Sequence, residues 1–440
     1  MDKLSVVISC PIDTYSGYGA RARDIVKSFL SLEKYDVRIL SQRWGNTRFG
    51  YLKDHNEHEI ASLIIPKLTQ KPDVWIQLTI PNEFQPVGKY NIGMTAGIET
   101  TICDPSWIEG CNRMNLIIAS SNHAKETFER SIFDVENNGQ SAGQIRLQKP
   151  VEVLFEGVDI EKYFKTAVKS SSDMSKTLDA IEESFCYLFV GHWLQGAFNE
   201  DRKNVGMLIK VFLETFKNKK NAPALVLKTQ SANASILDRD GILKKIEEIR
   251  KTVRGTLPNI YLLHGEASDN EINELYNHSK VKAMVSLTKG EGFGRPLLEF
   301  SAVSKPIVAS NWSGHLDFLA SDFNYLVKGS ITPVHESAIV EKMIIKESEW
   351  FTVDPNDAAN ALRIVYQDYK KYVGLAKRQS YKTRTQFSIE QMKDLLGSIL
   401  DRNLPEFPKQ VELKLPTLQL PKLQKVDKPL ELPKLQKING

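Results

Sequence analysis

The chain has 440 residues, of which 41% are apolar and 25% are charged. This composition is typical of a globular protein, and the length exceeds one ordinary core, so we expect two domains of about 150–200 residues. The net charge of +4 is too small for this length to indicate a general polyanion-binding protein. No run of about 18 apolar residues is present, which argues against a membrane-spanning helix.

The first part of the chain alternates strands with helices. Strand-like segments are predicted at residues 4–10, 37–40, 74–78, 91–94, 116–119 and 151–155, with helices at 20–32 and 122–130. A polar stretch with three consecutive serines, residues 166–177, then predicts a linker.

The alternation begins again after this stretch. Strands are predicted at 186–190, 224–227, 260–263, 281–287 and 306–309, and helices at 205–216, 241–253, 270–277, 296–303, 357–372 and 389–400. Two such series predict an α/β protein with two doubly wound parallel sheets, that is, two Rossmann-like domains facing a cleft in which a ligand binds. We expect domains at 1–165 and 178–384, with a return helix within 385–402 that crosses back to the first domain.

Residues 403–440 differ in composition from the rest. They hold six of the nineteen prolines, seven lysines and a hexapeptide, Leu-Pro-Lys-Leu-Gln-Lys, that occurs twice. Prolines at this density disfavour a helix or a central strand, so we expect an extended tail. Either it is a solvated tail, or it docks on a protein or a membrane surface.

The four cysteines form neither a CxxC pair nor a zinc spacing. Three of them lie in apolar or strand-like contexts, where we expect buried free thiols, and this fits a reducing compartment. The N-terminus leads directly into a predicted strand, with too few apolar residues for a signal peptide. We therefore expect a cytoplasmic protein, either free or peripheral at the membrane.

The most informative stretch is Lys289-Gly-Glu-Gly-Phe-Gly-Arg-Pro-Leu-Leu-Glu299, which follows a predicted buried strand. Pro296 suits the first turn of a helix, so Glu291 lies on the loop and Glu299 one turn into the helix. Glycine-bearing amides between them can point at an anion at the helix N-terminus. Carboxylates that accept from hydroxyls, beside amides that donate to phosphate, suit a sugar attached to a diphosphate.

This stretch resembles the E-x7-E signature of retaining GT-B glycosyltransferases, the large fourth family of enzymes that use nucleotide sugars. Further segments resemble that family's motifs in the same order, over roughly residues 1–400. They are Ser16-Gly-Tyr-Gly19, Ser120-Ser-Asn-His-Ala-Lys125, Glu156-Gly-Val-Asp159, Phe189-Val-Gly191, Arg202-Lys203-Asn204 and Ser310-Asn-Trp-Ser-Gly314. Pro81-Asn-Glu-Phe84 and Gly97-Ile-Glu-Thr100 look like a bacterial and phage subgroup.

The resemblance implies a role for each matching residue. Glu299 would accept hydrogen bonds from the nucleotide ribose, and Glu291 would face the donor sugar. Lys203 would stabilise the charge that develops on the leaving diphosphate. Backbone amides of the intervening loop would serve sugar hydroxyls or phosphate; these belong to Gly292, Phe293 and Gly294.

The sequence departs from the family where His192 replaces an arginine, and residues 193–201 lengthen the loop that follows. Either His192 donates to phosphate or Arg202 replaces the missing charge, and we favour Arg202. In the first domain, Gly17 and Gly19 either let the backbone approach the donor phosphate or the acceptor, or form a simple turn. Glu99 is a candidate for orienting the acceptor.

A metal site was considered because Asp238-Arg-Asp240 spells the D-x-D motif of another glycosyltransferase fold. No predicted strand comes just before it, so capping of the helix predicted at 241–253 is the preferred interpretation. The resemblance implies no essential metal and no cofactor besides the donor.

These features together predict a hexosyltransferase that uses a UDP-, GDP- or ADP-sugar and acts with retention on an acceptor hydroxyl. The resemblance implies front-face attack, with the leaving phosphate taking the acceptor's proton. We expect a cell-surface glycan or its precursor as the acceptor. Two alternatives stay open: a phage-type enzyme acting on a modified DNA base, which keeps nucleic acid as a partner, and a non-catalytic nucleotide-sugar-binding protein.

Overall fold

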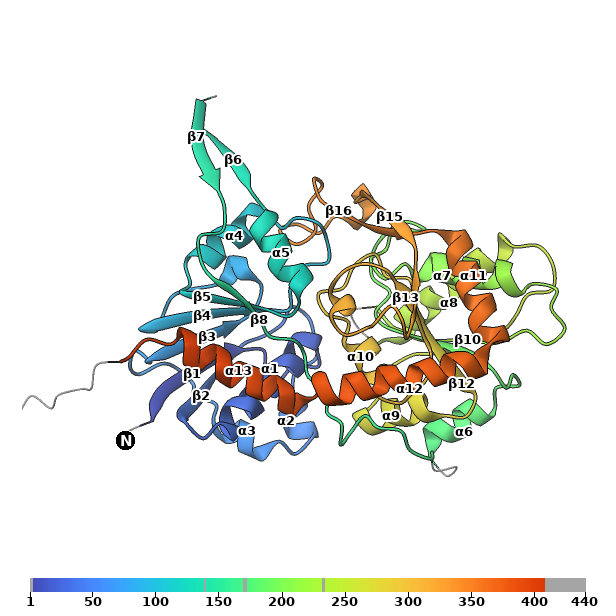
Figure 1. Cartoon of the computed structure of the whole chain (residues 1–440), viewed down its shortest axis with the longest axis horizontal. Helices are drawn as coiled ribbons and strands as arrows, with labels where there is room; N and C mark the ends of the chain where they lie inside the picture. Colours follow the sequence, from blue (N-terminus) through green and yellow to red (C-terminus); the bar gives the residue numbers. More distant parts are fainter. Residues whose placement is uncertain (1–2, 138–139, 169–171, 232–233, 408–440) are drawn as a thin grey trace, which may run out of the picture. The chain divides into compact units, whose positions relative to one another are not determined.

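The computed structural model describes residues 3–137, 140–168, 172–231 and 234–407 (Figure 1). Residues up to Leu404 belong to one compact unit. The expected tail was placed at 403–440, but the last helix includes Asn403, and residues 408–440 lie outside the described part. The predicted conformation of the tail therefore stays a prediction.

The first sheet has six strands in the order β2-β1-β3-β4-β5-β8, and every neighbouring pair is parallel. Its strands are β1 Leu4–Cys10, β2 Tyr35–Ser41, β3 Val74–Leu78, β4 Tyr90–Thr95, β5 Leu116–Ala119 and β8 Val151–Val153. Several are buried along their whole length, as expected for strands covered on both faces by helices.

The second sheet repeats this architecture with the order β11-β10-β9-β12-β13-β14, again entirely parallel. Its strands are β9 Cys186–Val190, β10 Ala224–Lys228, β11 Ile260–Leu263, β12 Val281–Ser286, β13 Ile307–Ser310 and β14 Tyr325–Val327. The predicted α/β fold with two doubly wound parallel sheets is confirmed.

Most of the helices begin at residues that cap them. Ser121 accepts from the Ala124 amide at the start of α5, and Ser268 forms a capping box with Glu271 at the start of α9. The helices of the two sheets are α1 Gly17–Ser31, α4 Pro105–Asn112, α5 Asn122–Arg130, α7 Val205–Phe216, α8 Ile236–Lys251, α9 Asp269–Asn277, α10 Arg295–Ser301 and α11 Pro355–Gln367. Shorter elements are α2 Tyr51–Asp54, α3 His58–Ser62 and α6 Asp173–Asp179.

The largest departures from the predicted boundaries concern three segments. The helix predicted at 357–372 is two helices, α11 and α12 Tyr369–Gln386, because the backbone leaves helical geometry at Asp368. The helix predicted at 241–253 begins at Ile236, because Ser235 caps it. The linker predicted at 166–177 contains the start of α6, which Ser172 caps.

Two antiparallel hairpins have no counterpart in the predicted elements. They are β6 Phe133–Asn137 with β7 Gln140–Ile145, and β15 Gly329–Pro333 with β16 Glu349–Val353.

The last helix, α13 Ile389–Asn403, packs beside α1, far from it in the sequence (Figure 1). Asp401 of α13 pairs with Lys34 at 3.2 Å, and Arg402 pairs with Glu152 at 3.3 Å. The end of the described chain therefore contacts the elements of the first sheet, while α12 just before it packs on α10.

Candidate active site

A tight turn before α7 carries Arg202 and Lys203. Asn204 adopts a left-handed conformation with φ 54°, and the Asp201 carboxylate accepts from the Val205 amide at 3.1 Å. The Lys289 amide donates to the Arg202 carbonyl at 2.7 Å. The turn is therefore fastened to the segment that follows β12, which places both cations beside the Glu291 loop.

The loop between β12 and α10 is held by backbone hydrogen bonds. The Glu291 amide donates to the Ser313 hydroxyl at 2.9 Å, and the Gly314 amide donates to the Glu291 carbonyl at 3.0 Å. Gly294 begins α10 with φ 98°, a conformation that favours glycine. These bonds set the Glu291 side chain toward Lys203.

The structure brings four of the predicted side chains together. The Lys203 ammonium donates to a carboxylate oxygen of Glu291. Arg202 Nη1 lies 3.6 Å from Glu291 Oε2 and 3.4 Å from Glu99 Oε1. Glu99 comes from the loop after β4, so this cluster joins residues from the regions of both sheets.

The charges in this cluster are set by burial and by the close neighbours. Burial raises the pKa of Glu291, but the charges of Lys203 and Arg202 lower it by more than burial raises it. The pKa of Glu291 therefore lies below its ordinary value, and the carboxylate is ionised at neutral pH. The His192 side chain is exposed, but desolvation by neighbouring atoms and the charges of the same two cations lower its pKa. His192 is therefore neutral at pH 7, and Arg202 supplies the second positive charge.

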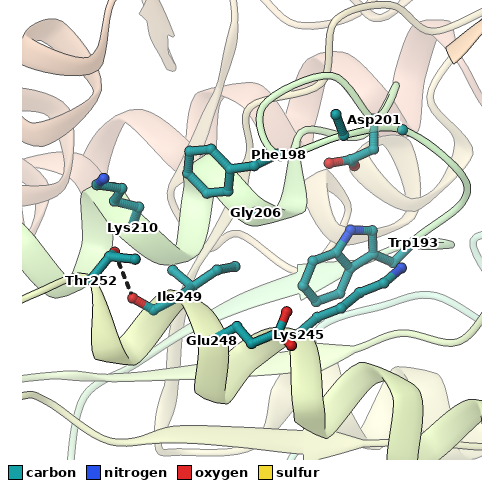
Figure 2. Close-up of a pocket in the computed structure, with 11 residues that line it drawn as sticks. Trp193, Phe198, Asp201, Gly206, Lys210, Lys245, Glu248, Ile249 and Thr252 are labelled. Carbon is teal, nitrogen blue, oxygen red and sulfur yellow. Dashed lines mark hydrogen bonds between the residues drawn. The ribbon is translucent and has the colours of Figure 1, made fainter. Parts of the chain in front are cut away.

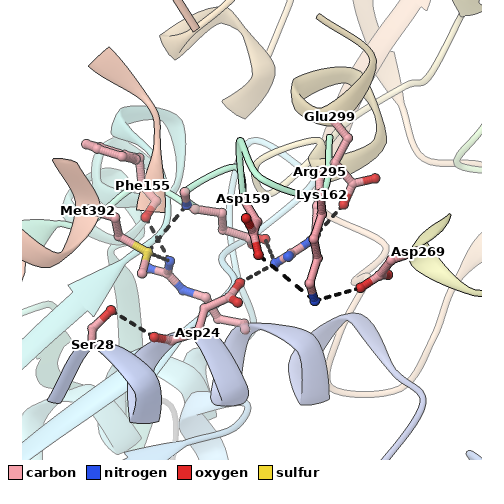
Figure 3. Close-up of polar contacts among 12 residues, drawn as sticks. Asp24, Ser28, Phe155, Asp159, Lys162, Asp269, Arg295, Glu299 and Met392 are labelled. Atoms are coloured by element: carbon pink, nitrogen blue, oxygen red, sulfur yellow. Dashed lines mark hydrogen bonds and ion pairs between the residues drawn. The ribbon is translucent and has the colours of Figure 1, made fainter. Parts of the chain in front are cut away.

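Glu299 lies in a second polar cluster (Figure 3). It accepts from Arg295 Nε at 3.0 Å and from the Tyr276 hydroxyl at 3.3 Å. Burial raises the pKa of Glu299 to about 7, although the Arg295 charge lowers it. Near neutral pH this carboxyl is thus about half ionised.

The stability of the protein should depend on the ionisation of Glu299. Because its folded-state pKa lies above the ordinary value of 4.5, the folded state binds the proton more tightly than the unfolded state. Ionisation therefore lowers the free energy of unfolding as pH rises from about 4.5 through about 7. Over this pH range we expect the free energy of unfolding of Glu299→Gln to rise by roughly 3 kcal/mol relative to that of wild type.

Denaturant unfolding at pH 5 and pH 8 measures this difference. The control is Glu390→Gln, at an exposed carboxylate of α13. Its free energy of unfolding relative to wild type should not change between the two pH values. A constant difference between Glu299→Gln and wild type at both pH values would contradict the raised pKa.

The loop between β12 and α10, which was expected to offer backbone amides to a ligand, has three amides without a protein partner among the described residues. Within the described part of the chain, the Gly292, Phe293 and Gly294 amides donate to no protein acceptor. The Phe293 side chain, in contrast, is 3% exposed and packs against Phe318 with ring centroids 5.1 Å apart. The Phe293 side chain therefore belongs to the core, and only its backbone amide is without a protein partner in the described ranges.

Gly17 and Gly19, which were expected either to let the backbone approach a ligand or to form a simple turn, both lie in the first turn of α1. The Gly19 amide already donates to the Ser16 hydroxyl at 2.9 Å, and a Cβ at Gly19 would collide with Thr14. Gly19 is thus required by helix packing. A Cβ at Gly17 would meet no atom within 4 Å, so space does not demand glycine there.

Comparisons with known proteins agree with this architecture. Residues 199–350 match the family model described as glycosyl transferases group 1, and this segment includes Arg202, Lys203, Glu291 and Glu299. A glycosyltransferase from Rickettsia africae superposes with a TM-score of 0.61 over 92% of this chain and 100% of that chain, at 14% identity.

The fold is GT-B. HepE (Alr3699) of Anabaena, in complex with UDP-glucose, superposes with a TM-score of 0.59 at 14% identity, over 91% of this chain and 100% of that chain. Sucrose-phosphate synthase of Thermosynechococcus elongatus superposes with a TM-score of 0.59 at 12% identity, over 91% of this chain and 99% of that chain. No curated protein matches the chain in sequence. The matched family model supports a glycosyltransferase.

Several residues near the GT-B site were not singled out from the sequence. Tyr18 stacks on Trp44 with centroids 3.9 Å apart, and its hydroxyl lies 3.0 Å from Thr95 Oγ1. Arg295 contacts both Glu299 and Asp24. The i,i+4 spacing of Arg295 and Glu299 on one helix was a signal that could have found the first of these contacts.

The inserted residues 193–201 build a cavity instead of extending the ionic cluster (Figure 2). Its volume is about 380 Å³, and the Lys245 ammonium lies 5.2 Å from the centroid of the Trp193 ring on one wall. Neither Lys203 nor Glu291 lines it. The cavity is therefore not part of the Lys203 cluster.

The D-x-D segment lies inside α8, where Asp238 accepts from the Ser231 amide at 3.0 Å and contacts His264 Nε2 at 2.7 Å. Nowhere in the described ranges do three or more His, Cys, Asp or Glu side chains gather so that they could hold a metal ion. Among the described helices, none is both long and apolar enough to cross a bilayer. All four cysteines are free and buried, where the sequence predicted this for three of them.

Proposed function

We propose that this chain is a retaining glycosyltransferase that moves a hexose from a nucleotide diphosphate sugar to an acceptor hydroxyl. The observation that carries the proposal is the cluster of Lys203, Arg202 and Glu291, which lies on a GT-B fold within the segment matched by the family model. Two cations and one ionised carboxylate, next to loop amides without protein acceptors, suit a sugar diphosphate.

The cations would act on the leaving group. As the bond between the sugar C1 and the diphosphate oxygen breaks, negative charge grows on that oxygen, and Lys203 and Arg202 stabilise it most in the transition state. In the absence of donor, Lys203 and Arg202 pair with Glu291. When the donor binds, its phosphates replace Glu291 as the anionic partner of these cations. The cations are therefore already oriented before the donor binds, which lowers the cost of reorganisation.

The remaining groups would position the two substrates. Glu291 accepts from donor sugar hydroxyls, Glu299 from ribose hydroxyls, and Glu99 orients the acceptor. The acceptor oxygen bonds to C1 on the face that the diphosphate leaves, and its proton passes to the departing phosphate oxygen. No dedicated enzyme base is required in this scheme.

A donor screen tests the proposal. UDP-, GDP- and ADP-hexoses are incubated with the full chain, and thermal stabilisation and release of free nucleoside diphosphate are measured. HepE holds UDP-glucose, which makes UDP-glucose the first donor to try. At least one donor should both stabilise the protein and be hydrolysed or transferred. Failure of every donor on both readouts would overturn the proposal.

The same assays separate the alternatives. Binding without hydrolysis or transfer, in the presence of a glycan acceptor pool, would identify a nucleotide-sugar-binding protein. Transfer to modified DNA, with salt-sensitive DNA binding, would identify a DNA-modifying enzyme. A cell-surface glycan or its precursor remains the proposed acceptor, reached from the cytoplasm, with residues 403–440 as a proposed docking segment for a protein or membrane surface.

Turnover should not require a divalent metal, because Lys203, Arg202 and loop amides supply the positive charge near the diphosphate. Treatment with EDTA is expected to change donor hydrolysis by less than about twofold. A metal-dependent glycosyltransferase assayed alongside verifies that chelation is complete. Loss of turnover that added Mg²⁺ or Mn²⁺ restores would contradict this prediction.

A further inference from the structure

Arg295 contacts three carboxylates that come from three different segments (Figure 3). Its Nη1 donates to Asp24 Oδ2 on α1 at 2.6 Å and lies 3.7 Å from Glu156 Oε2, after β8. Its Nε donates to Glu299 Oε1 on α10 at 3.0 Å. One guanidinium thus connects the elements of the first sheet to the helix that follows the glycine-rich loop.

These contacts are largely removed from water. Asp24, Glu156 and Glu299 have side chains 11%, 9% and 10% exposed, and Arg295 is 22% exposed. Hydrogen bonds between ionised groups are strong in such surroundings, and removal of one partner leaves a charge uncompensated. The geometry of Arg295 therefore depends on Asp24 as much as on Glu299.

A second arginine forms the same kind of bridge. Arg202 Nη1 lies between Glu99 Oε1, after β4, and Glu291 Oε2. Each glutamate of the E-x7-E motif is thus connected through one arginine to a carboxylate from the region of the first sheet. Because Arg202 also faces the proposed phosphate site, Arg295 is the better residue for isolating what such a bridge does.

We propose that Arg295 is a positioning residue that couples Glu299 to Asp24, so that Glu299 binds the nucleotide ribose well only while α1 and α10 are joined through it. This inference rests on the proposed function, in which Glu299 accepts from the ribose. Asp24 would then influence nucleotide affinity without touching the nucleotide.

The charges around Glu299 explain why Arg295 is needed. On α9, Asp269 repels the Glu299 charge, and Tyr276 donates to it. The nearby cation Lys162 is paired with Asp269 at 2.9 Å. The other groups that face this network are Tyr163, Asp24, Glu156 and Arg21, and Arg21 donates to the Leu154 and Phe155 carbonyls. Arg295 is therefore the cation that orients Glu299 and offsets part of the rise in pKa that burial causes.

A double-mutant cycle tests the coupling. Asp24→Asn, Glu299→Gln and the double variant of the full chain are titrated by calorimetry with the nucleoside diphosphate of the donor found in the screen. We expect Asp24→Asn to weaken nucleotide binding about fivefold to thirtyfold in the wild-type background and by less than twofold in the Glu299→Gln background. Asp401→Asn, which removes only the exposed pair with Lys34 beside α1, should leave the affinity unchanged.

The pH dependence of nucleotide binding separates positioning from a merely structural role. Wild-type affinity should fall as pH decreases through about 7, where Glu299 takes up a proton. Arg295→Leu should move this midpoint to higher pH, because the neighbouring cation is gone, and Arg295→Lys should move it back toward wild type. A role confined to stability would lower the melting temperature and leave the midpoint in place.

The outcomes distinguish this inference from the proposed function. No nucleotide binding by the wild-type chain overturns the proposed function and this inference together. Binding with additive effects of Asp24→Asn and Glu299→Gln overturns this inference alone, as does an Arg295→Leu midpoint equal to that of wild type. If Asp24→Asn does not fold, the cycle is repeated with Arg295→Lys in its place, and the same criterion of additivity applies.

Discussion

Replacement of Lys203 by methionine is expected to slow donor turnover about tenfold to a few hundredfold, because a hydrogen bond to a charged group contributes roughly 1.5–3 kcal/mol. The loss should fall on kcat more than on KM, since the leaving-group charge is greatest in the transition state. Steady-state release of nucleoside diphosphate measures both constants. Lys217→Met, at an exposed lysine just after α7, is the matched control and should turn over like wild type.

Stability must be separated from catalysis in this experiment. Lys203 is bonded to the buried carboxylate of Glu291, so its loss leaves that charge less compensated. The double variant Lys203→Met with Glu291→Gln should recover melting temperature without recovering turnover. Wild-type turnover in Lys203→Met, or recovery of turnover in the double variant, would contradict a role for Lys203 at the leaving group.

Gly290→Ala should reduce turnover by about a hundredfold while the protein stays folded. A Cβ at Gly290 would come within 3.0 Å of the Glu99 carbonyl oxygen, closer than real Cβ atoms approach, so the loops after β4 and β12 would have to separate. Misplacement of reacting groups by about 1 Å can cost on the order of a hundredfold in rate. Arg202 would lose its position between Glu99 and Glu291.

Turnover and thermal melting of Gly290→Ala are measured together. Gly374→Ala in α12 is the control, because a Cβ there meets no atom within 4 Å and alanine favours a helix interior by roughly 0.5–1 kcal/mol. It should melt slightly higher and turn over normally. Unchanged turnover in Gly290→Ala would show that contact between the two loops is not part of the reaction.

Much of the fold could be predicted from local pattern. β1, β3, β5, β9, α5 and α7 begin and end where the apolar periodicity placed them. The starts of α6 and α8 were missed although Ser172 and Ser235 are local capping signals, whereas other errors arose where no local pattern carried the information. The break at Asp368 between α11 and α12 lies within a continuous helical pattern, and β15 and β16 are stabilised by pairing with each other across a long intervening segment.

The candidate site was likewise predicted only in part from the sequence. The glycine-rich stretch predicted a loop and a helix start after a strand, and both are present. The sequence favoured Arg202 over His192 as the substitute for the missing arginine. The structure places Arg202 between two carboxylates, while the charges of Lys203 and Arg202 disfavour a proton on His192. The structure also shows that the close approach of Thr14 leaves no room for a side chain at Gly19.

The sequence by itself determined the two parallel sheets, the strand–loop–helix unit that carries Glu291 and Glu299, and the order of the motifs. These follow from backbone hydrogen bonding and side-chain periodicity, which act over a few residues. Only the tertiary structure decided which groups from distant segments meet at those glutamates. Arg295 and Asp24 are 271 positions apart and meet only where two separately wound layers contact each other. Such a contact depends on helix packing and side-chain reach, which local periodicity does not encode.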